Sequence, residues 1–394
     1  MGNITLSKIF SKTTPILGNS WYKLLPGLVN QVLAFFVVKQ SGVTTWGQVV
    51  ALQLVYYIAV HIVSWGNKDY LLLQFSKYPT KINHYLQQSI LTRAFILLPP
   101  ILLLVFFYSP FKTAIYLISW VVLRFISQAL EAIITYEKNF SLALRSEAAA
   151  FVFLLFGLTF WHHNLSFQKA LLLILLSHLG RVFWLMPFLI IRLKGLSFAK
   201  LNLTHLWGSI PFVLMGLIAL LQLKIDLYVM NGLSTKSLTG TYQVLMGFVA
   251  MFFVIPGFII NPFVKNIYRL KPIQIVALQY KFIGLGLIMS LLAAPILWGV
   301  LCFVYQLAFA PETYLLLTAL IFLPFVYAFD VYKLYKINAQ NSVLVISTIG
   351  IAIVFAACLL LIPVCQINGA LLAQLLAQLF LVFLLKYRTA KINA

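Results

Sequence analysis

The sequence predicts an all-α fold, a polytopic membrane protein of about twelve transmembrane helices in two six-helix lobes. Apolar residues make up 62% of the 394 residues and charged residues only 9%, so the chain has too few charges to solvate a soluble protein of this length. The mean hydropathy is +1.00. The apolar residues form continuous runs and not the every-second-residue alternation of a membrane β-barrel. Disorder, a coiled coil and a disulfide scaffold are excluded by the same composition.

The individual helices follow from the length that a bilayer requires. Its hydrocarbon core of about 30 Å needs about 20 mostly apolar residues per helix. Polar clusters and Gly, Pro, Asn or Asp residues separate the apolar runs, and the third and fourth runs are separated only at Ser109-Pro110. The expected spans, in chain order, are 17–38, 46–66, 89–109, 113–136, 145–161, 169–191, 208–229, 240–262, 280–305, 312–332, 342–362 and 367–386.

The formal net charge of +21 reports mainly on topology. A strongly basic chain can bind nucleic acid, but apolar runs of this length argue against that partner. Lys and Arg residues outside the expected spans gather on one side, which the positive-inside rule makes cytoplasmic. An even number of spans then places both the N- and C-termini in the cytoplasm. The opposite, outer side carries only Lys39, Lys112, Lys169 and Lys236.

The two halves of the chain resemble each other in layout. Residues 45–48 (TWGQ) open the second expected span, and residues 239–242 (TGTY) open the eighth. Each span follows a helix with a proline near its start and ends before a basic cytoplasmic stretch. This pattern favours two lobes in parallel orientation, residues 1–200 and 201–394, which is a common transporter plan.

Ionisable side chains inside the spans point to a site. Each costs about 2.5–3.5 kcal/mol on insertion scales, so such residues usually face a cavity or a partner. On a helix, residues three, four, seven or eleven apart share a face, so the polar residues of the first and fourth spans form stripes. We predict that the stripes converge on a cationic, water-filled cavity for an anion such as phosphate, which Arg binds as a fork and Lys as a point charge. The predicted binding residues are Lys23, Arg124, Arg181, Asn30 and Gln128.

Three further ionisable residues, Glu131, Lys224 and Asp226, are candidates for coupling or gating. A carboxylate beside a membrane cavity can change its protonation state. The alternative for any of these charges is a purely structural role, as an ion pair or an interfacial helix end. Glu147 lies within an expected span and Arg145 nearer its end; under the structural alternative both would lie near the interface, where long side chains reach back to water.

The cysteines indicate no cofactor chemistry. Cys302, Cys358 and Cys365 lie in or beside apolar runs and show none of the Cys-Cys or Cys-His spacings of metal sites. We therefore expect neither a bound metal nor a cofactor.

Three short stretches resemble a known family. Residues 226–230 (DLYVM), Gly240-Thr241-Tyr242 and Ile255-Pro256 look like the seventh and eighth helices of bacterial polysaccharide flippases. These are the Wzx-type members of the multidrug/oligosaccharidyl-lipid/polysaccharide exporter superfamily. Residues 42–47 resemble the family's turn after helix one, and 362–370 the turn into the last helix.

The resemblance implies alternating access between two lobes in the bacterial inner (plasma) membrane. Its usual substrate is an oligosaccharide, such as an O-antigen or exopolysaccharide repeat unit, linked to undecaprenyl diphosphate. The anionic diphosphate suits the predicted cationic cavity. The resemblance also suggests polymerase and chain-length proteins as partners, and H⁺ or Na⁺ as the coupling ion.

Two alternatives stay open at this point. A cation-coupled multidrug exporter of the same superfamily would need buried acids in the N-terminal half, where Glu131 is available but three cations argue against it. A membrane polysaccharide polymerase or glycosyltransferase would tend to carry a large outer loop or an acidic pair, and the outer loops here are short. We therefore predict a transporter and not an enzyme.

Overall fold

All regular structure in the described part of the chain is helical. The computed structural model describes residues 6–161, 165–195, 201, 203–260, 263, 267, 269–337 and 339–393. Within these residues, ten helices are long and apolar enough to cross a membrane. The predicted all-α membrane class is confirmed, and the count of twelve spans stays a prediction. The last two residues of the expected span 240–262 lie outside the described residues.

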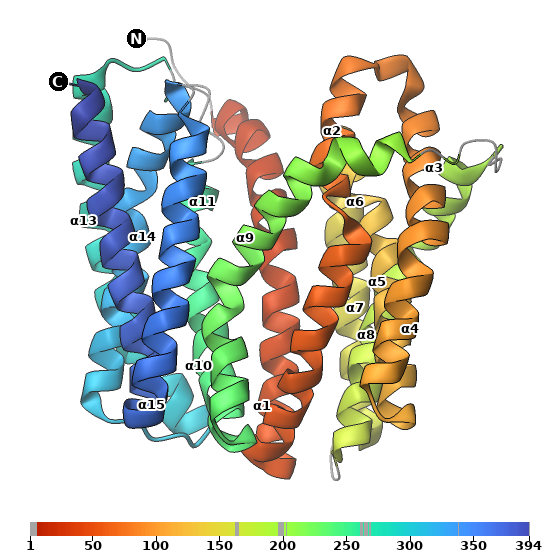
Figure 1. The fold of residues 1–394 in the computed structure, drawn as a ribbon, viewed down its shortest axis with the longest axis horizontal. Coiled ribbons are helices and arrows are strands. Elements are labelled where there is room, and N and C mark those ends of the chain that lie inside the picture. The colour runs from red at the N-terminus through yellow and green to blue at the C-terminus, as the bar shows by residue number, and fades with distance from the viewer. Residues whose placement is uncertain are drawn as a thin grey trace. The chain divides into compact units, whose positions relative to one another are not determined.

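The elements follow the apolar runs of the sequence closely (Figure 1). Short 3-10 or π-helical segments at Pro79–Lys81, Arg93–Leu97 and Val300–Val304 connect or extend some of the α-helices. The α-helices are α1 (Leu6–Ser64), α2 (Asn67–Lys77), α3 (Ile82–Thr92), α4 (Leu98–Tyr108), α5 (Phe111–Ala129), α6 (Glu131–Tyr136), α7 (Phe140–Trp161), α8 (Phe167–Leu193), α9 (Thr204–Leu233), α10 (Lys236–Phe253), α11 (Ile255–Ile260), α13 (Pro272–Gly299), α14 (Pro311–Lys336) and α15 (Gln340–Asn393).

Two of the ten candidate spans are far longer than a bilayer requires. Tyr22–Lys77 has 56 residues and Gln340–Lys391 has 52, whereas about 20 residues cross the hydrocarbon core. Each contains a break in helical geometry, at Gly42 with φ 82° in α1 and at Gln366 with φ 49° in α15. Glycine adopts positive φ without strain, whereas a side chain at this φ is strained. Each broken helix is therefore long enough to supply two membrane crossings.

The described helices form two compact units. The first unit comprises Met1–Ser41 and Gln48–Leu217, and the second comprises Gly42–Gly47 and Ile218–Ala394. The predicted lobe boundary at residue 200 falls beside 196–200, which lie outside the described residues. That boundary therefore stays a prediction.

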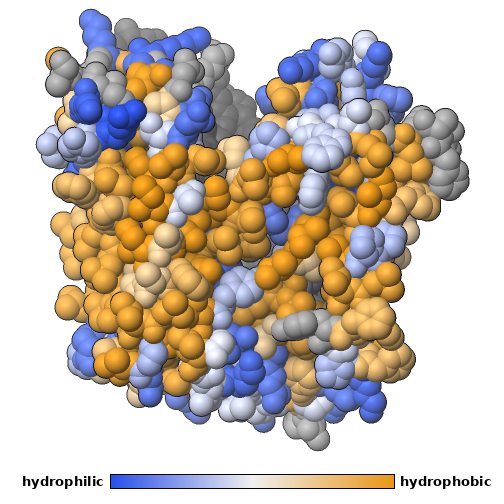
Figure 2. Space-filling model, viewed as in Figure 1, coloured by the Kyte–Doolittle hydropathy of each residue, from blue (hydrophilic) through white to orange (hydrophobic). Residues whose placement is uncertain are grey.

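The first unit packs aromatic and aliphatic side chains between its helices. Helices α7 and α8 pack extensively against each other, and α8 also contacts α5. Trp120 of α5 is fully buried and meets the ring of Tyr56 of α1 edge to face, with 5.9 Å between ring centroids. Within each unit, hydrophobic side chains cover the middle of the helices on the visible face and hydrophilic side chains gather at their ends (Figure 2), as a bilayer requires.

The second unit is built on the neighbouring helices α13, α14 and α15. Phe282 packs against Phe325, with ring centroids 5.1 Å apart, and both belong to a buried cluster. Near the end of α14, Gln279 donates to Asp330 at 2.9 Å, and Lys333 donates to both Gln279 and Asp330 at 2.7 and 2.9 Å. This closed triangle satisfies a buried carboxylate and fixes α13 against α14.

Two glycines of the second unit allow a close approach of backbones. A Cβ atom built on Gly240 of α10 would lie 2.4 Å from the Val43 carbonyl oxygen and 2.8 Å from the Gly47 nitrogen. A Cβ on Gly47 would lie 1.7 Å from the Lys236 carbonyl oxygen. Small residues at such crossings allow membrane helices to pack tightly. The two stretches that the sequence shows as similar, around Gly47 and Gly240, therefore meet each other.

We expect Gly240→Ala to lower the thermal stability of the purified protein, because the added methyl overlaps backbone atoms that have little freedom to move. Overpacking of this kind costs about 1–3 kcal/mol, which a thermal unfolding scan in detergent detects as a fall of several degrees. The matched control is Gly284→Ala on α13, where an added Cβ meets nothing within 4 Å. Equal melting temperatures for the two variants would contradict the close approach.

Candidate functional site

A buried ion pair lies between two helices of the first unit. Arg181 of α8 donates from Nε to Glu147 Oε1 and from Nη2 to Glu147 Oε2, both at 2.7 Å. The two side chains are only 8% and 5% exposed. Parallel hydrogen bonds between a guanidinium and a carboxylate are the strongest geometry for such a pair. The pair neutralises both charges and ties α7 to α8.

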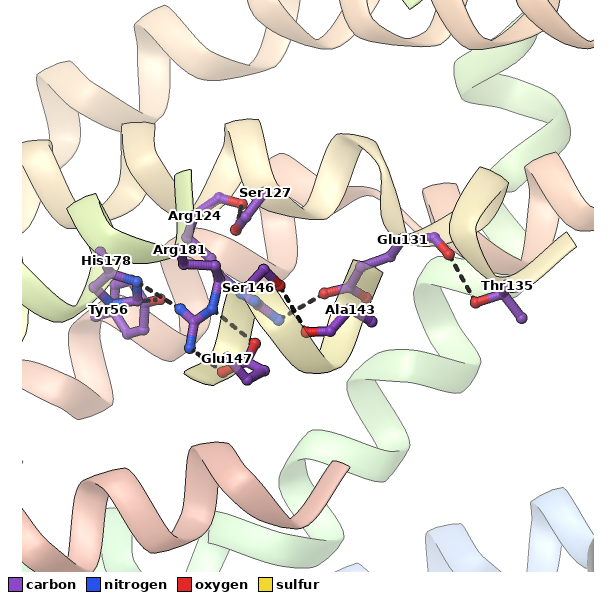
Figure 3. A network of polar contacts seen from close by, with 10 residues as sticks. All are labelled: Tyr56, Arg124, Ser127, Glu131, Thr135, Ala143, Ser146, Glu147, His178 and Arg181. Carbon is purple, nitrogen blue, oxygen red and sulfur yellow. Dashed lines mark hydrogen bonds and ion pairs between the residues drawn. The ribbon is translucent and has the colours of Figure 1, made fainter. Parts of the chain in front are cut away.

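The pair extends through a histidine to α1 (Figure 3). Arg181 Nη1 lies 3.0 Å from His178 Nδ1, and His178 Nε2 lies 3.3 Å from the Tyr56 hydroxyl. A guanidinium only donates, so His178 Nδ1 accepts and its proton is on Nε2. His178 is therefore a neutral link in a chain of hydrogen bonds that runs from Glu147 to Tyr56.

A second ion pair joins α5 to α6. Arg124 Nη2 donates to Glu131 Oε1 at 2.9 Å, and these side chains are 25% and 22% exposed. The residues are seven apart and lie on either side of Leu130, where the helix is interrupted. The contact is a single hydrogen bond, unlike the two-point contact of Arg181 with Glu147. This pair is the more open and the weaker of the two.

The two ion pairs form one network of polar residues. Arg124, Arg181, Glu131 and Glu147 all lie within electrostatic range of the Tyr56 and Tyr22 hydroxyls of α1. Two arginines and two glutamates give the network no net formal charge. Neutrality is what the interior of a membrane favours, because an unbalanced charge there is costly.

The three other predicted binding residues also belong to the first unit, and they differ in exposure and in hydrogen bonding. Lys23 is exposed on α1. Asn30 is half-buried and accepts a hydrogen bond from Gln53 Nε2 at 3.0 Å, which ties the two arms of the broken helix α1 together. Gln128 is half-buried on α5, one turn from both Arg124 and Glu131. Gln128 is therefore the predicted residue that lies beside the Arg124–Glu131 pair on the same helical face.

In the second unit, Asp226 lies in a buried polar group. The Tyr242 hydroxyl donates to Asp226 Oδ2, the Leu227 amide donates to Oδ1 at 2.7 Å, and Gln374 also hydrogen-bonds the carboxylate. Lys224 is half-buried within electrostatic range of Asp226. The Asp and the Gly-x-Tyr that carried the family resemblance are thus direct partners. Among the described residues, no three His, Cys, Asp or Glu side chains form a group that could hold a metal.

Glu147 and Arg145 lie two residues apart on α7 but in different surroundings. Glu147 is buried and holds Arg181, whereas Arg145 is exposed. The sequence carries no signal for this pair, because its members are 34 residues apart on different helices. The partners Tyr56 and Gln374 were missed for the same reason.

Arg93 is a buried cation that the sequence places only near a helix end. It is fully buried, donates to Ser89 Oγ at 3.2 Å and to the Ser64 carbonyl at 3.4 Å, and lies 5.2 Å from the Phe125 ring centroid. No carboxylate contacts it in the described part of the chain. Ser64 ends α1, so a cation here stabilises the negative end of that helix. Arg93 therefore has a structural role at the turn between α1 and α2.

Comparison with solved structures identifies the architecture. A structure of the lipid II flippase MurJ in an inward closed conformation matches with a TM-score of 0.68 at 12% identity, over 93% of this chain and 87% of that chain. The Vibrio cholerae MATE transporter VcmN in its bent form matches with a TM-score of 0.53 at 13% identity, over 97% and 95%. This chain therefore shares its fold with a protein named a flippase and with one named a transporter.

At 12% and 13% sequence identity, these similarities show a shared fold only. No protein-family model matches the sequence, and no curated protein matches it. The shared fold is what the predicted superfamily implies, whereas the Wzx-type specificity stays a proposal.

We expect Arg181→Gln and Glu147→Gln each to destabilise the protein strongly, because each leaves a buried charge without its partner. Breaking one side of such a pair costs about 3–5 kcal/mol. Replacing both residues by leucine removes both charges, and we expect that double variant to unfold at a higher temperature than either single variant. Thermal unfolding in detergent measures all three.

The matched control is Arg192→Gln, which breaks the more exposed Arg192–Glu137 pair. Exposed pairs contribute about 0–1 kcal/mol, so this variant should unfold close to the wild type. Single variants at Arg181 and Glu147 that are as mild as Arg192→Gln would contradict the structural importance of the buried pair.

Proposed function

We propose that this protein is a Wzx-type flippase that moves an undecaprenyl-diphosphate-linked oligosaccharide across the bacterial inner membrane by alternating access. The observation that carries the proposal is the partly exposed side chain of Arg124, whose guanidinium is held within a membrane-spanning unit by one hydrogen bond to Glu131. A guanidinium binds phosphate oxygens through parallel hydrogen bonds. The shared fold with a lipid II flippase supports the same class of lipid-linked cargo.

The candidate residues have different proposed roles because their side chains differ in exposure. Lys23 and Arg124 are the proposed partners of the diphosphate, because both retain exposed surface. Asn30 and Gln128 are half-buried amides that would complete the contact with neutral hydrogen bonds. Arg181 has all three guanidinium nitrogens engaged by Glu147 and His178. Its proposed role is therefore to hold Glu147 and not to contact the headgroup.

We propose that a coupling ion, H⁺ or Na⁺, drives transport by binding to carboxylates. Glu131 shares Arg124 in the first unit, and Asp226 with Lys224 nearby forms the buried polar group of the second unit. Protonation of a carboxylate, or its pairing with Na⁺, changes the charge of its surroundings and so favours one conformation over another. Polymerase and chain-length proteins are the proposed partners in the membrane.

The alternative of a cation-coupled drug exporter is supported by the likeness to a MATE transporter. Organic cations bind to buried carboxylates, and the two acids of the first-unit network are Glu131 and Glu147. Both are already paired with arginines, which argues against a cationic cargo. Drug-resistance profiles of cells that express the protein distinguish the two functions, because a flippase leaves resistance unchanged.

We expect Arg124→Gln and Lys23→Gln to lower polysaccharide export at least tenfold when each replaces the wild type in a strain that lacks its flippase. Loss of one charge-assisted contact costs about 1.5–3 kcal/mol, which corresponds to about a tenfold to hundredfold effect. Surface polysaccharide is measured by immunoblot, and undecaprenyl-linked repeat units should accumulate. The control Arg192→Gln removes an arginine outside the network and should export normally. Normal export by the Arg124→Gln and Lys23→Gln double variant would refute the proposed function.

We expect Asp226→Asn to weaken the dependence of transport on an ion gradient, because the amide keeps the size of the side chain but neither ionises nor binds a proton near neutral pH. Reconstituted proteoliposomes with an imposed H⁺ or Na⁺ gradient provide the measurement. Tyr242→Phe is the matched variant, since it removes the hydrogen-bond donor and keeps the carboxylate. Asp226 has no coupling role if Asp226→Asn responds to the gradients as the wild type does.

A further inference from the structure

The two arginine–glutamate pairs of the polar network differ in how much of each guanidinium is engaged. Arg181 uses Nε, Nη1 and Nη2, and its pair with Glu147 is buried. Within the described residues Arg124 uses only Nη2 for its bond to Glu131. The Arg124 side chain is 25% exposed, and the Glu131 side chain is 22% exposed. An anion can therefore reach Arg124 while Arg181 stays occupied.

The network is neutral, and this limits what it can bind. An additional negative charge beside Arg124 would leave the network with a net charge inside the membrane, where unbalanced charge is costly. The added anion would also lie close to the Glu131 carboxylate, and like charges at short range repel. Uptake of one proton by Glu131 removes both penalties, because the network then keeps its original charge.

We infer that the Arg124–Glu131 pair is an exchange site that couples binding of the anionic headgroup to uptake of a proton by Glu131. The inference rests on the proposed function, since the headgroup is the anion that displaces Glu131. In the exchange, the Nη2 hydrogen bond to Glu131 breaks and hydrogen bonds from Arg124 to a phosphate oxygen form. A proton from water adds to the released Glu131 carboxylate. A diphosphate diester carries two negative charges. The proton on Glu131 offsets one of them, and the ammonium of the exposed Lys23, the other proposed partner of the diphosphate, offsets the second.

Glu131 is the group in this network that can take the proton at least cost. Both oxygens of Glu147 accept from Arg181, so its protonation would disrupt two hydrogen bonds. His178 Nδ1 accepts from Arg181, and a proton there would face another donor. Protonation of Glu131 gives up one hydrogen bond, to Arg124.

The charged and titratable groups around Glu131 contribute to any pH dependence of anion binding. Arg124 on α5 is its direct partner. The other titratable or charged groups of this network are Tyr22 and Tyr56 on α1, Glu147 on α7, and His178 and Arg181 on α8. Since Arg181 holds Glu147 and His178 in fixed hydrogen bonds, Glu131 is the group freed by the exchange.

The experiment measures proton uptake during anion binding by the full-length protein in lipid nanodiscs. The probe is geranylgeranyl diphosphate, added at near-neutral pH in weak buffer with a soluble pH indicator. We expect the wild type to take up about one proton per bound probe beyond any change in the probe itself. By linkage, uptake of one proton on binding makes the affinity fall about tenfold for each unit of pH increase over the range in which that uptake occurs.

Glu131→Gln is the decisive variant, because it removes the competing charge and the proton acceptor together. We expect it to bind the probe at least as tightly as the wild type, without the extra proton uptake and without the steep pH dependence. Its signal also reports the probe's own change in protonation. The matched control Glu137→Gln alters an acid paired with Arg192 outside the network, and it should behave as the wild type in both measurements.

The possible outcomes distinguish failure of the proposed function from failure of the exchange. If the folded wild type does not bind the probe, the proposed function fails and the exchange fails with it. If the wild type binds the probe and Glu131→Gln shows the same proton uptake and pH dependence, the exchange is wrong and the proposed function stands. Size-exclusion profiles and melting temperatures of the variants exclude misfolding as the cause of a difference.

Discussion

The need to neutralise charge within the membrane interior governs the arrangement of the polar residues in this protein. A lone guanidinium or carboxylate is unfavourable where the dielectric constant is low. Specific contacts compensate the buried charges described above. Arg181 is paired with Glu147, and Asp226 accepts hydrogen bonds from a tyrosine, a glutamine and a backbone amide. Arg93 is placed at the negative end of a helix. The helices can carry these groups because neighbouring residues form hydrogen bonds with each of them.

The same constraint divides the charged residues into fixed and exchangeable ones. A buried pair with parallel hydrogen bonds, such as Arg181 with Glu147, would leave an unpaired charge if it opened, so it acts as part of the scaffold. A partly exposed pair with one hydrogen bond, such as Arg124 with Glu131, loses much less on opening because water and ligands can replace the partner. A neutral network is therefore compatible with binding an anion, provided that one of its acids is held loosely.

The sequence predicts the helices well because their lengths follow directly from apolar composition and the thickness of a bilayer. It does not predict the positive φ of Gln366, since glutamine is not a residue that favours that conformation. Within the site, the stripe that contains Arg124, Gln128 and Glu131 is visible because helical periodicity is a local property. The pairing of Arg181 with Glu147 is not visible, because it depends on how α7 packs against α8. Counting the three cations therefore suggested a positive cavity, whereas the acids that neutralise two of them appear only in the fold.

The position of the Arg124–Glu131 pair links its chemistry to the geometry of the helices. The two residues lie on either side of Leu130, where φ −93° and ψ −12° interrupt the helix and the Leu130 amide turns to the Ser127 carbonyl. In an unbroken helix, residues seven apart are separated by about 10.5 Å along the axis, so the ion pair depends on the long arginine side chain and on the angle between α5 and α6. A change in that angle alters the distance between the two charges, and loss of the ion pair removes a restraint on the angle. Occupation of Arg124 by another anion would therefore act directly on the shape of this helix pair, which is the kind of two-state element that alternating access requires.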